Sequence, residues 1–177
     1  MKLVDHASKS LIFSDDSISV IDCLNNAISK NVDIDCADFS GHNFLHCSFT
    51  LKTTGSLFKD SIFYDFKSWN GDVSASIFNG AVITKSEFRF SDLSYVIFEK
   101  STLQNCDFSR SNLNSSCFFD VTVLNTDFAG CSFCDGADIV RSVFIDCDFT
   151  DCDFTKIEIK DSVFIDCKGL NDSHIKY

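Results

Sequence analysis

The chain has 177 residues, a length typical of one domain, and a formal net charge of −11 at pH 7. This charge argues against direct binding to nucleic acid phosphates or to anionic membrane surfaces, because both need Lys and Arg. A basic partner, or a protein surface that normally holds DNA, remains compatible with it. The chain has no Pro, so backbone N–H groups are available throughout for a ladder of hydrogen bonds.

Residues 1–33 are expected to form an N-terminal segment that precedes a repeat. Asp15–Ser17 supplies side-chain oxygens suited to a helix N-cap. Apolar residues then recur at helical spacing, at Ile18, Ile21, Leu24 and Ile28. The pattern predicts a short amphipathic helix over about residues 17–30, ended by Asn31 in a left-handed turn. Such a helix would cap the open end of the repeat and protect its edge.

A period of five residues runs through residues 34–168. In each group of five, or pentad, a small residue stands in the first place and a large apolar residue in the third. Between Ser101 and Phe133 the third places are Leu103, Phe108, Leu113, Phe118, Val123, Phe128 and Phe133. A period of five fits neither a helix nor a flat strand. It fits a coil that turns a corner after each pentad and stacks on the next coil, which is the logic of a solenoid.

Some pentads come close to Ala-Asp-Phe in their first three places. They are Ala37-Asp38-Phe39, Cys106-Asp107-Phe108, Ala137-Asp138-Ile139, Cys147-Asp148-Phe149 and Cys152-Asp153-Phe154. The chain resembles the bacterial-type pentapeptide-repeat family, whose consensus is roughly A-[DN]-[LF]-x-x. The resemblance implies an all-β fold, a right-handed quadrilateral β-helix with four pentads per coil and here about six to seven coils. It implies no particular function, because a solenoid is a scaffold.

The five-residue spacing breaks twice. Phe58 stands nine positions after Phe49 instead of ten, so one residue is missing from a double step. One residue is added at 134–136, where Gly136 suits a bulge. Beyond the repeat, residues 169–177 are expected to form a C-terminal tail.

One interior pentad is irregular in composition. Ser68 stands in the third place, where Phe is expected, and Trp69, the one Trp of the chain, follows it. Two interpretations are open. Phe66 or Trp69 fills the core in place of Ser68, or a protruding loop presents Trp69 and Tyr64 to a partner.

The second place of each pentad is expected to point outward from one of four faces. We number the faces by their third-place columns, which begin at Phe39 (one), Phe44 (two), Phe49 (three) and Ile34 (four). The outward residues of faces three and four form a predicted acidic strip: Glu87, Asp107, Asp127 and Asp148, with Asp72, Asp92 and Asp153. Those of faces one and two form a predicted apolar strip: Leu57, Ile77, Ile97 and Cys117, with Ile62, Val82, Thr102, Thr122, Val143 and Val163.

Each strip has two interpretations. The carboxylates are solvated surface residues that the repeat habitually uses, or they form a ladder of charge like that of DNA. The apolar residues favour strands for backbone and packing reasons, or they mark an interface.

The sequence contains no recognisable catalytic constellation, so we expect no enzyme and no cofactor. Six of the ten Cys take the small first place (Cys47, Cys106, Cys131, Cys147, Cys152 and Cys167), where a free thiol behaves as a small hydrophobe. Neither Cys131-Ser132-Phe133-Cys134 nor the His42 and His46 pair beside Cys47 is expected to bind a metal. With no evident signal peptide or membrane span, the cysteines indicate a reducing cytoplasm.

Two classes of function follow. The first is a non-enzymatic scaffold for protein–protein interaction. It would engage an unknown protein, or a second copy as a homodimer, through Ile77 and Ile97, through the region of Trp69, or through an end of the solenoid. The second comes from the resemblance, since some pentapeptide-repeat proteins mimic duplex DNA and act on type II topoisomerases. It implies DNA gyrase as partner and protection from quinolones or toxins. A third alternative is a secreted bacterial effector.

Overall fold

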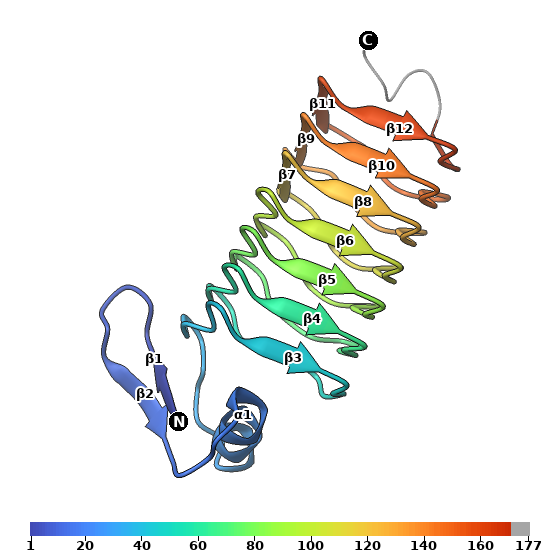
Figure 1. The fold of residues 1–177 in the computed structure, drawn as a ribbon. Helices are drawn as coiled ribbons and strands as arrows, with labels where there is room; N and C mark the ends of the chain where they lie inside the picture. The colour runs from blue at the N-terminus through green and yellow to red at the C-terminus, as the bar shows by residue number, and fades with distance from the viewer. Residues whose placement is uncertain (171–177) are drawn as a thin grey trace.

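The structure, a computed structural model, describes residues 1–170. The chain winds into a rod of stacked coils, and each strand of one side lies directly above the corresponding strand of the coil before it (Figure 1). That side is face two, a parallel sheet of seven strands in chain order. Its strands are β3 (Asn43–Leu45), β4 (Ile62–Tyr64), β5 (Val82–Thr84), β6 (Thr102–Gln104), β8 (Thr122–Leu124), β10 (Val143–Ile145) and β12 (Val163–Ile165).

Face one carries a second, shorter parallel sheet. Its three strands are β7 (Cys117–Phe119), β9 (Asp138–Val140) and β11 (Glu158–Lys160). The remaining sides are joined by isolated parallel bridges, such as Glu87 to Asp107 on face three and Asp72 to Asp92 on face four. The predicted four-sided, nearly all-β solenoid is therefore confirmed.

The third-place residues form the core, as the period predicts. Phenylalanine rings of successive coils stack on one another, with ring centroids 5.3 Å apart for Phe88 and Phe108 and 5.4 Å for Phe108 and Phe128. All three rings are buried. Each buried Phe side chain contributes on the order of 2–3 kcal/mol before the entropic cost of ordering it.

First-place side chains hold the coils together by hydrogen bonds. The Ser111 hydroxyl donates to the backbone oxygen of Phe88 at 2.6 Å and accepts from the backbone nitrogen of Ser91 at 3.1 Å. The Cys131 thiol donates to the backbone oxygen of Phe108 at 2.9 Å. A small residue with a polar hydrogen therefore satisfies backbone groups that the corner leaves without a ladder partner. This explains why Ser and Cys share the first place.

The corners use the left-handed region of backbone space. Twenty-four non-glycine residues among the described residues have positive φ, and most of them occupy the fifth place of a pentad. None of these is Val, Ile or Thr. A side chain branched at Cβ clashes most in this conformation, so the fifth place excludes β-branched residues.

Both predicted breaks in the repeat are confirmed. Ser48 pairs with Lys67, 19 positions later, while Lys52 pairs with Asp72, 20 positions later, so the missing residue lies between Ser48 and Lys52. Asn112 pairs with Ser132, 20 positions later, while Cys117 pairs with Asp138, 21 positions later, so the added residue lies between Ser132 and Asp138. Gly136 has a φ of 91° at this point, as a bulge requires.

The predicted N-terminal helix is present but starts later than expected. Helix α1 (Val20–Ser29) begins after the N-cap residue Ser19, whose hydroxyl accepts from the backbone nitrogen of Asp22 at 3.1 Å. Asp15, expected near the N-cap, instead binds the backbone nitrogen of Ser17 at 3.0 Å and the Asn26 amide at 2.7 Å. The left-handed Asn31, with a φ of 53°, is confirmed.

A hairpin that the sequence pattern does not predict precedes the helix. Strands β1 (Lys2–Val4) and β2 (Leu11–Ser14) pair antiparallel. The end of β1 and the residue after it pair with the first coil, since the backbone nitrogen of Asp38 donates to the oxygen of Val4 at 2.8 Å and Asp5 forms a bridge with Ala37. The strands are short and lack clear alternation, which is why the period gave no signal.

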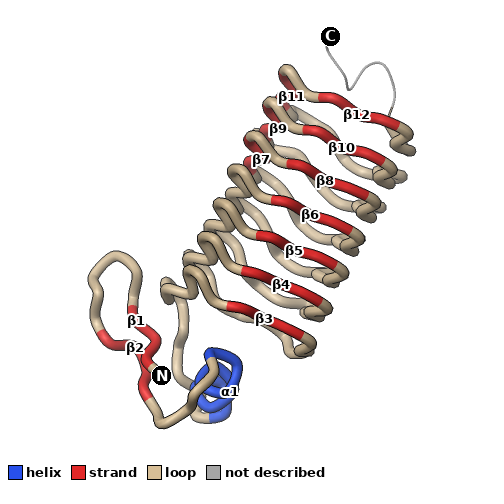
Figure 2. The backbone as a smooth tube through the Cα atoms, viewed as in Figure 1, coloured by secondary structure: helices blue, strands red, loops and turns tan. Residues whose placement is uncertain are grey.

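Helix and hairpin cover the N-terminal end of the rod (Figure 2). The buried face of α1 joins the same hydrophobic core as the first coils through Val20, Cys23, Leu24 and Ala27. Of the predicted tail 169–177, residues 171–177 lie outside the described residues.

Candidate interaction surfaces

The acidic residues predicted on face three form one continuous column. Glu87, Asp107, Asp127 and Asp148 pair in register through parallel bridges, one coil apart. Lys67 precedes Glu87 in the column and Lys168 follows Asp148. Adjacent coils lie about 4.8 Å apart, so carboxylates stacked at this spacing repel one another unless they are solvated or paired.

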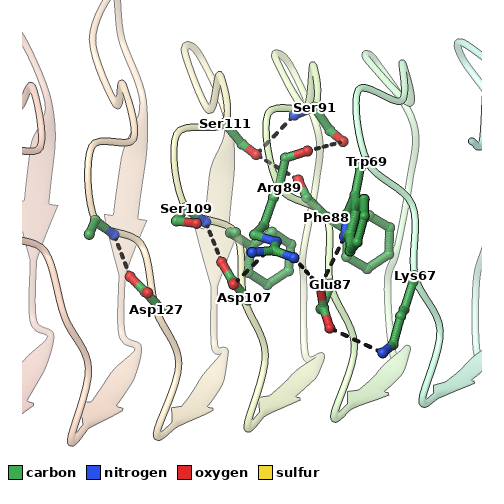
Figure 3. Close-up of polar contacts among 12 residues, drawn as sticks. Lys67, Trp69, Glu87, Phe88, Arg89, Ser91, Asp107, Ser109, Ser111 and Asp127 are labelled. Carbon is green, nitrogen blue, oxygen red and sulfur yellow. Dashed lines mark hydrogen bonds and ion pairs between the residues drawn. The ribbon is translucent and has the colours of Figure 1, made fainter.

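The first part of the column is paired (Figure 3). The Glu87 carboxylate accepts from Arg89 at 2.8 Å and from the Trp69 indole nitrogen at 2.9 Å, and it lies 3.4 Å from the Lys67 ammonium. The Arg89 guanidinium also lies 3.5 Å from the carboxylate of Asp107. Two cations therefore compensate Glu87 and Asp107, and the predicted charge ladder is weakened at this end.

The second part of the column has fewer cationic partners. A carboxylate oxygen of Asp127 accepts from the backbone nitrogen of Ala129 at 2.7 Å. Asp148 accepts from the Thr150 hydroxyl and backbone nitrogen, and these bonds, with Lys168 at 3.9 Å, lower the pKa of Asp148. Asp127 and Asp148 are therefore the less compensated part of the column.

The bond from a second-place carboxylate to the backbone two residues later is general. It is made by Asp38, Asp72, Asp92, Asp107, Asp127, Asp148 and Asp153. This is the side-chain mimic of a turn that Asp and Asn favour. The repeat therefore has a local, structural reason to use Asp at this place, whatever the surface binds.

A shallow groove of about 450 Å³ follows the corner between faces two and three. Its acidic lining comes from Glu87, Asp107, Asp127, Asp146 and Asp148, and Lys85 and Lys168 lie in the same lining. The groove is open along the rod. It offers carboxylates to a basic segment, rather than a deep pocket to a small molecule.

Face four does not continue the acidic strip. Its outward column runs Lys52, Asp72, Asp92, Asn112, Ser132 and Asp153. The Asn112 amide donates to Asp92 at 3.1 Å, and Ser132 separates it from Asp153. The structure therefore leaves one run of four carboxylates, on face three, and only a neighbouring pair on face four.

Trp69 lies on the outside of face three and does not enter the core. Phe66 fills the core from the first place of the same pentad and is fully buried, which confirms one of the two interpretations of this pentad. The Arg89 guanidinium stacks over the Trp69 ring at 4.6 Å, and the indole is 47% exposed. The pentad keeps its regular pairing of Lys67 with Glu87, so the alternative of a protruding loop is wrong.

The apolar strip is unequal on its two faces. On face one, Ile77 and Ile97 are half-buried. The same outward column begins with Asp38 and has Asp138 after Cys117, so it is not apolar throughout. On face two, Ile62 and Val82 are each 41% exposed and Val163 is 50% exposed. The more exposed apolar surface is therefore the outer side of the seven-stranded sheet, which sequence reasoning placed on a level with face one.

Two exposed residues that the sequence analysis did not single out extend this surface. Leu45 and Ile165, in the fourth place of the first and last pentads of face two, are 44% and 43% exposed. Fourth places carry no regular pattern in the sequence, so only the fold shows that these side chains are exposed on the two end strands of the sheet.

The described residues include no group of three or more His, Cys, Asp or Glu placed to hold a metal ion. The one helix of the described residues, α1, is too short and too polar to cross a bilayer. All ten cysteines are free thiols.

Comparison with known proteins gives a match to the repeat itself. Residues 86–122 match the family model of pentapeptide repeats, with eight copies. A search of curated proteins finds no significant match.

Among solved structures, a trypsin-treated form of QnrB1, a plasmid-mediated fluoroquinolone resistance protein, superposes with a TM-score of 0.53 at 19% identity. The match covers 71% of this chain and 68% of QnrB1, and it shows a shared fold. A pentapeptide repeat protein from the thylakoid lumen of Arabidopsis thaliana gives a TM-score of 0.46 at 16% identity, over 68% of this chain and 66% of its own. HetL, from a Nostoc cyanobacterium, gives 0.29 at 10% identity, over 82% and 94%.

Proposed function

Because the chain is a pentapeptide-repeat protein, we propose that it is a non-catalytic scaffold that binds a protein partner along the outer surface of its seven-stranded sheet. The observation that carries this proposal is the exposed apolar column of face two. Its outward residues follow one another in register: Ile62, Val82, Thr102, Thr122, Val143 and Val163. At about 4.8 Å per coil, the seven strands span roughly 30 Å.

The surroundings of this column support an interface. Polar and charged corner residues border it on both sides, with Asp60 and Lys100 at one edge and Lys85 and Asn105 at the other. An apolar centre with a polar rim is the usual anatomy of a protein interface. Four of the six outward residues, Ile62, Val82, Val143 and Val163, have no hydrogen-bonding side-chain group. The fitting partner therefore presents an extended apolar surface rather than a charged loop.

We place this scaffold in a reducing cytoplasm. The ten free thiols support that compartment, since thiols stacked in a solenoid stay reduced there. We do not propose the secreted-effector alternative, since no feature of the described residues favours it.

The test compares face two with face four in capture experiments. The intact chain carries a photo-crosslinking residue at position 104, and so does a Val82→Asp, Val163→Asp variant. A Ser132→Asp, Asn112→Asp variant adds the same charge on face four. We expect one crosslinked protein with the intact chain and the face-four variant, and its loss with the face-two variant.

Circular dichroism shows whether all three chains keep the fold. If the face-two variant still crosslinks the same protein, the proposal is wrong. Crosslinks only between copies of the chain, with a sedimentation coefficient that rises with concentration, show a homodimer in place of a scaffold.

A second candidate function is protection of a type II topoisomerase by mimicry of DNA. The run of four carboxylates on face three favours it, together with the fold shared with QnrB1, a fluoroquinolone resistance protein. Arg89 and Lys67 compensate part of this run, so the mimicry would depend most on Asp127 and Asp148.

The test is gyrase supercoiling in the presence of a fluoroquinolone. Asp107→Asn, Asp127→Asn and Asp148→Asn together remove three charges from face three. Asp72→Asn, Asp92→Asn and Asp153→Asn remove three charges from face four as the matched control. Protection by the intact chain and the control, lost only in the face-three variant, supports this function. If the intact chain does not change supercoiling in the presence of the fluoroquinolone, this second function is excluded.

A further inference from the structure

Two cysteines occupy equivalent positions in neighbouring coils near the C-terminal end of the described residues. Cys147 and Cys167 both take the first place on face three. The residues after them, Asp148 and Lys168, form a parallel bridge, and the backbone nitrogen of Lys168 donates to the oxygen of Cys147 at 2.9 Å. The two Cα atoms are therefore one coil step apart, about 4.8 Å, inside the usual range of roughly 4.4–6.8 Å for a disulfide.

The two side chains also point the same way. The Cys167 thiol donates to the backbone oxygen of Phe144 at 3.5 Å, and the Cys147 thiol lies 3.8 Å from the equivalent oxygen of Val123. The two thiols lie near enough for each to shift the pKa of the other. The first-place column therefore brings two thiols of adjacent coils close together.

We propose that Cys147 and Cys167 form a redox-active pair that closes into a disulfide between the last two coils on oxidation.

The two thiols differ in the way that such a pair needs. Cys147 is 1% exposed, whereas Cys167 is half-buried. The neighbouring thiol of Cys147 lowers the pKa of Cys167 to about 7. The same interaction, together with burial, raises the pKa of Cys147. An accessible, low-pKa thiol beside a second cysteine that can resolve it is the usual arrangement of an oxidation-sensitive site.

The comparison pair in this chain is Cys131 and Cys152. These residues also take the first place in neighbouring coils, on face four, where Ser132 pairs with Asp153. Their thiols donate to backbone oxygens, Cys131 to Phe108 at 2.9 Å and Cys152 to Phe128 at 3.0 Å. Burial raises the pKa of Cys152 to about 12 and that of Cys131 as well. Both thiols stay protonated at neutral pH and serve as the matched control.

The reaction with glutathione disulfide balances as two exchange steps. The Cys167 thiolate attacks one sulfur of glutathione disulfide, forms a mixed disulfide and releases one glutathione thiolate. Cys147 gives its proton to the released thiolate or to buffer, and its sulfur attacks the Sγ of Cys167. The second glutathione leaves as a thiolate and takes up a proton from water. The two cysteines are oxidised by two electrons, and one glutathione disulfide is reduced to two glutathione molecules.

The experiment treats the full chain with glutathione disulfide at neutral pH, then counts thiols after denaturation and maps disulfides by peptide mass spectrometry. We expect the ten free thiols to fall to eight, with a disulfide between the peptides that carry Cys147 and Cys167. The control variant, Cys131→Ser with Cys152→Ser, should form the same disulfide between Cys147 and Cys167 and lose the same number of thiols on oxidation. Cys147→Ser instead stops the reaction at a glutathione adduct on Cys167. Ser is tolerated at first places such as Ser142 and Ser162, so the variants are expected to fold.

A second readout needs no disulfide. With limiting iodoacetamide at pH 7, Cys167 is expected to be alkylated ahead of the other cysteines, and Cys147→Ala slows this alkylation because the neighbouring thiol is lost. A disulfide that maps to Cys131 and Cys152, a thiol count that stays at ten, or alkylation with no preference for Cys167 would each overturn the proposal.

Discussion

Phe66 and Ser68 exchange the two interior roles of their pentad. The Phe66 ring fills the core from the first place, and the Ser68 hydroxyl accepts from the backbone nitrogen of Leu51 at 2.8 Å from the third place. The same exchange occurs earlier in the chain, in the first pentad of face four after Ile34, where Leu51 is buried in the first place and the Thr53 hydroxyl donates to the backbone oxygen of Ile34 at 2.6 Å. A pentad thus needs one large apolar side chain and one small polar one, in either order.

The exchange predicts a large cost for truncating Phe66. Phe66→Ala leaves a cavity beside the rings of Phe44, Phe63 and Phe88 and should lower the free energy of unfolding by about 3–5 kcal/mol. Urea unfolding followed by circular dichroism measures it. Phe90→Ala, at an exposed corner position, is the control and should cost far less. Equal losses in the two variants would show that Phe66 is not a core residue.

The first-place ladder predicts a selective effect at Ser111. Ser111→Ala leaves the backbone oxygen of Phe88 and the backbone nitrogen of Ser91 buried without this partner. The free energy of unfolding should fall by about 1–3 kcal/mol. Ser111→Cys keeps a donor of the kind that Cys131 supplies and should lose less. Ser109→Ala, on the outside of the same face, is the control in the same denaturation experiment. If Ser109→Ala costs as much as Ser111→Ala, the ladder does not stabilise the coil.

Two aspartates should respond to pH with opposite sign. Burial, and then the neighbouring carboxylate of Glu158, raises the pKa of Asp138 above its value in the unfolded chain. The folded state therefore holds this proton more tightly, and the penalty for ionising Asp138 grows as pH rises above about 4. Asp138→Asn should raise the melting temperature at pH 7 and have little effect at pH 3. A destabilised variant at pH 7 would contradict this assignment.

Asp148 is the opposite case. Its bonds to Thr150, with Lys168 nearby, lower its pKa, so its stabilising effect is present above about pH 4 and is lost as pH falls through the folded pKa. Asp148→Asn should lower the melting temperature at pH 7, and the difference from the intact chain should disappear in acid. A melting temperature that this substitution leaves unchanged at pH 7 would mean that the bonds to Thr150 are not maintained in solution.

The Trp69 contact offers an optical test of the network on face three. Glu87→Gln weakens the bond to the indole nitrogen and the ion pairs with Lys67 and Arg89. Because Trp69 is the one Trp of the chain, its fluorescence should shift to longer wavelength as the ring becomes more hydrated. The change in unfolding free energy should stay below about 1 kcal/mol, since the pairs are at the surface. Glu99→Gln, on face one, should leave the emission unchanged.

The two register breaks show how far the five-residue pattern reaches. Counting between Phe49 and Phe58 located a deletion, and the pairing of Ser48 with Lys67 confirms it. The count did not reveal that Leu51 and Thr53 form the intervening pentad, because their large and small roles are exchanged. A search for one large and one small residue in either order would have found it.

The candidate surfaces were predictable in position but not in character. The second-place rule identified the outward residues of face three, yet Glu87 and Asp107 gain partners from Arg89, a fourth-place residue that no repeat position predicts. Likewise, Ile77 and Ile97 were placed on the outside, but the exposed apolar surface lies at Ile62, Val82 and Val163. The difference depends on how neighbouring side chains cover each column.

The five-residue period by itself determined the coil, its core columns and its outward columns, because each pentad must bury one large side chain before it turns a corner. The tertiary structure alone decided which residues distant in the chain lie together. Lys67 meets Glu87 and Cys147 lies near Cys167 in neighbouring coils, and Val4 of the N-terminal hairpin binds Asp38 of the first coil. The physical reason is that burial repeats locally along the chain, whereas charge pairing and thiol contact depend on side chains about twenty or more residues apart. Their separation is set only when the coils stack at about 4.8 Å.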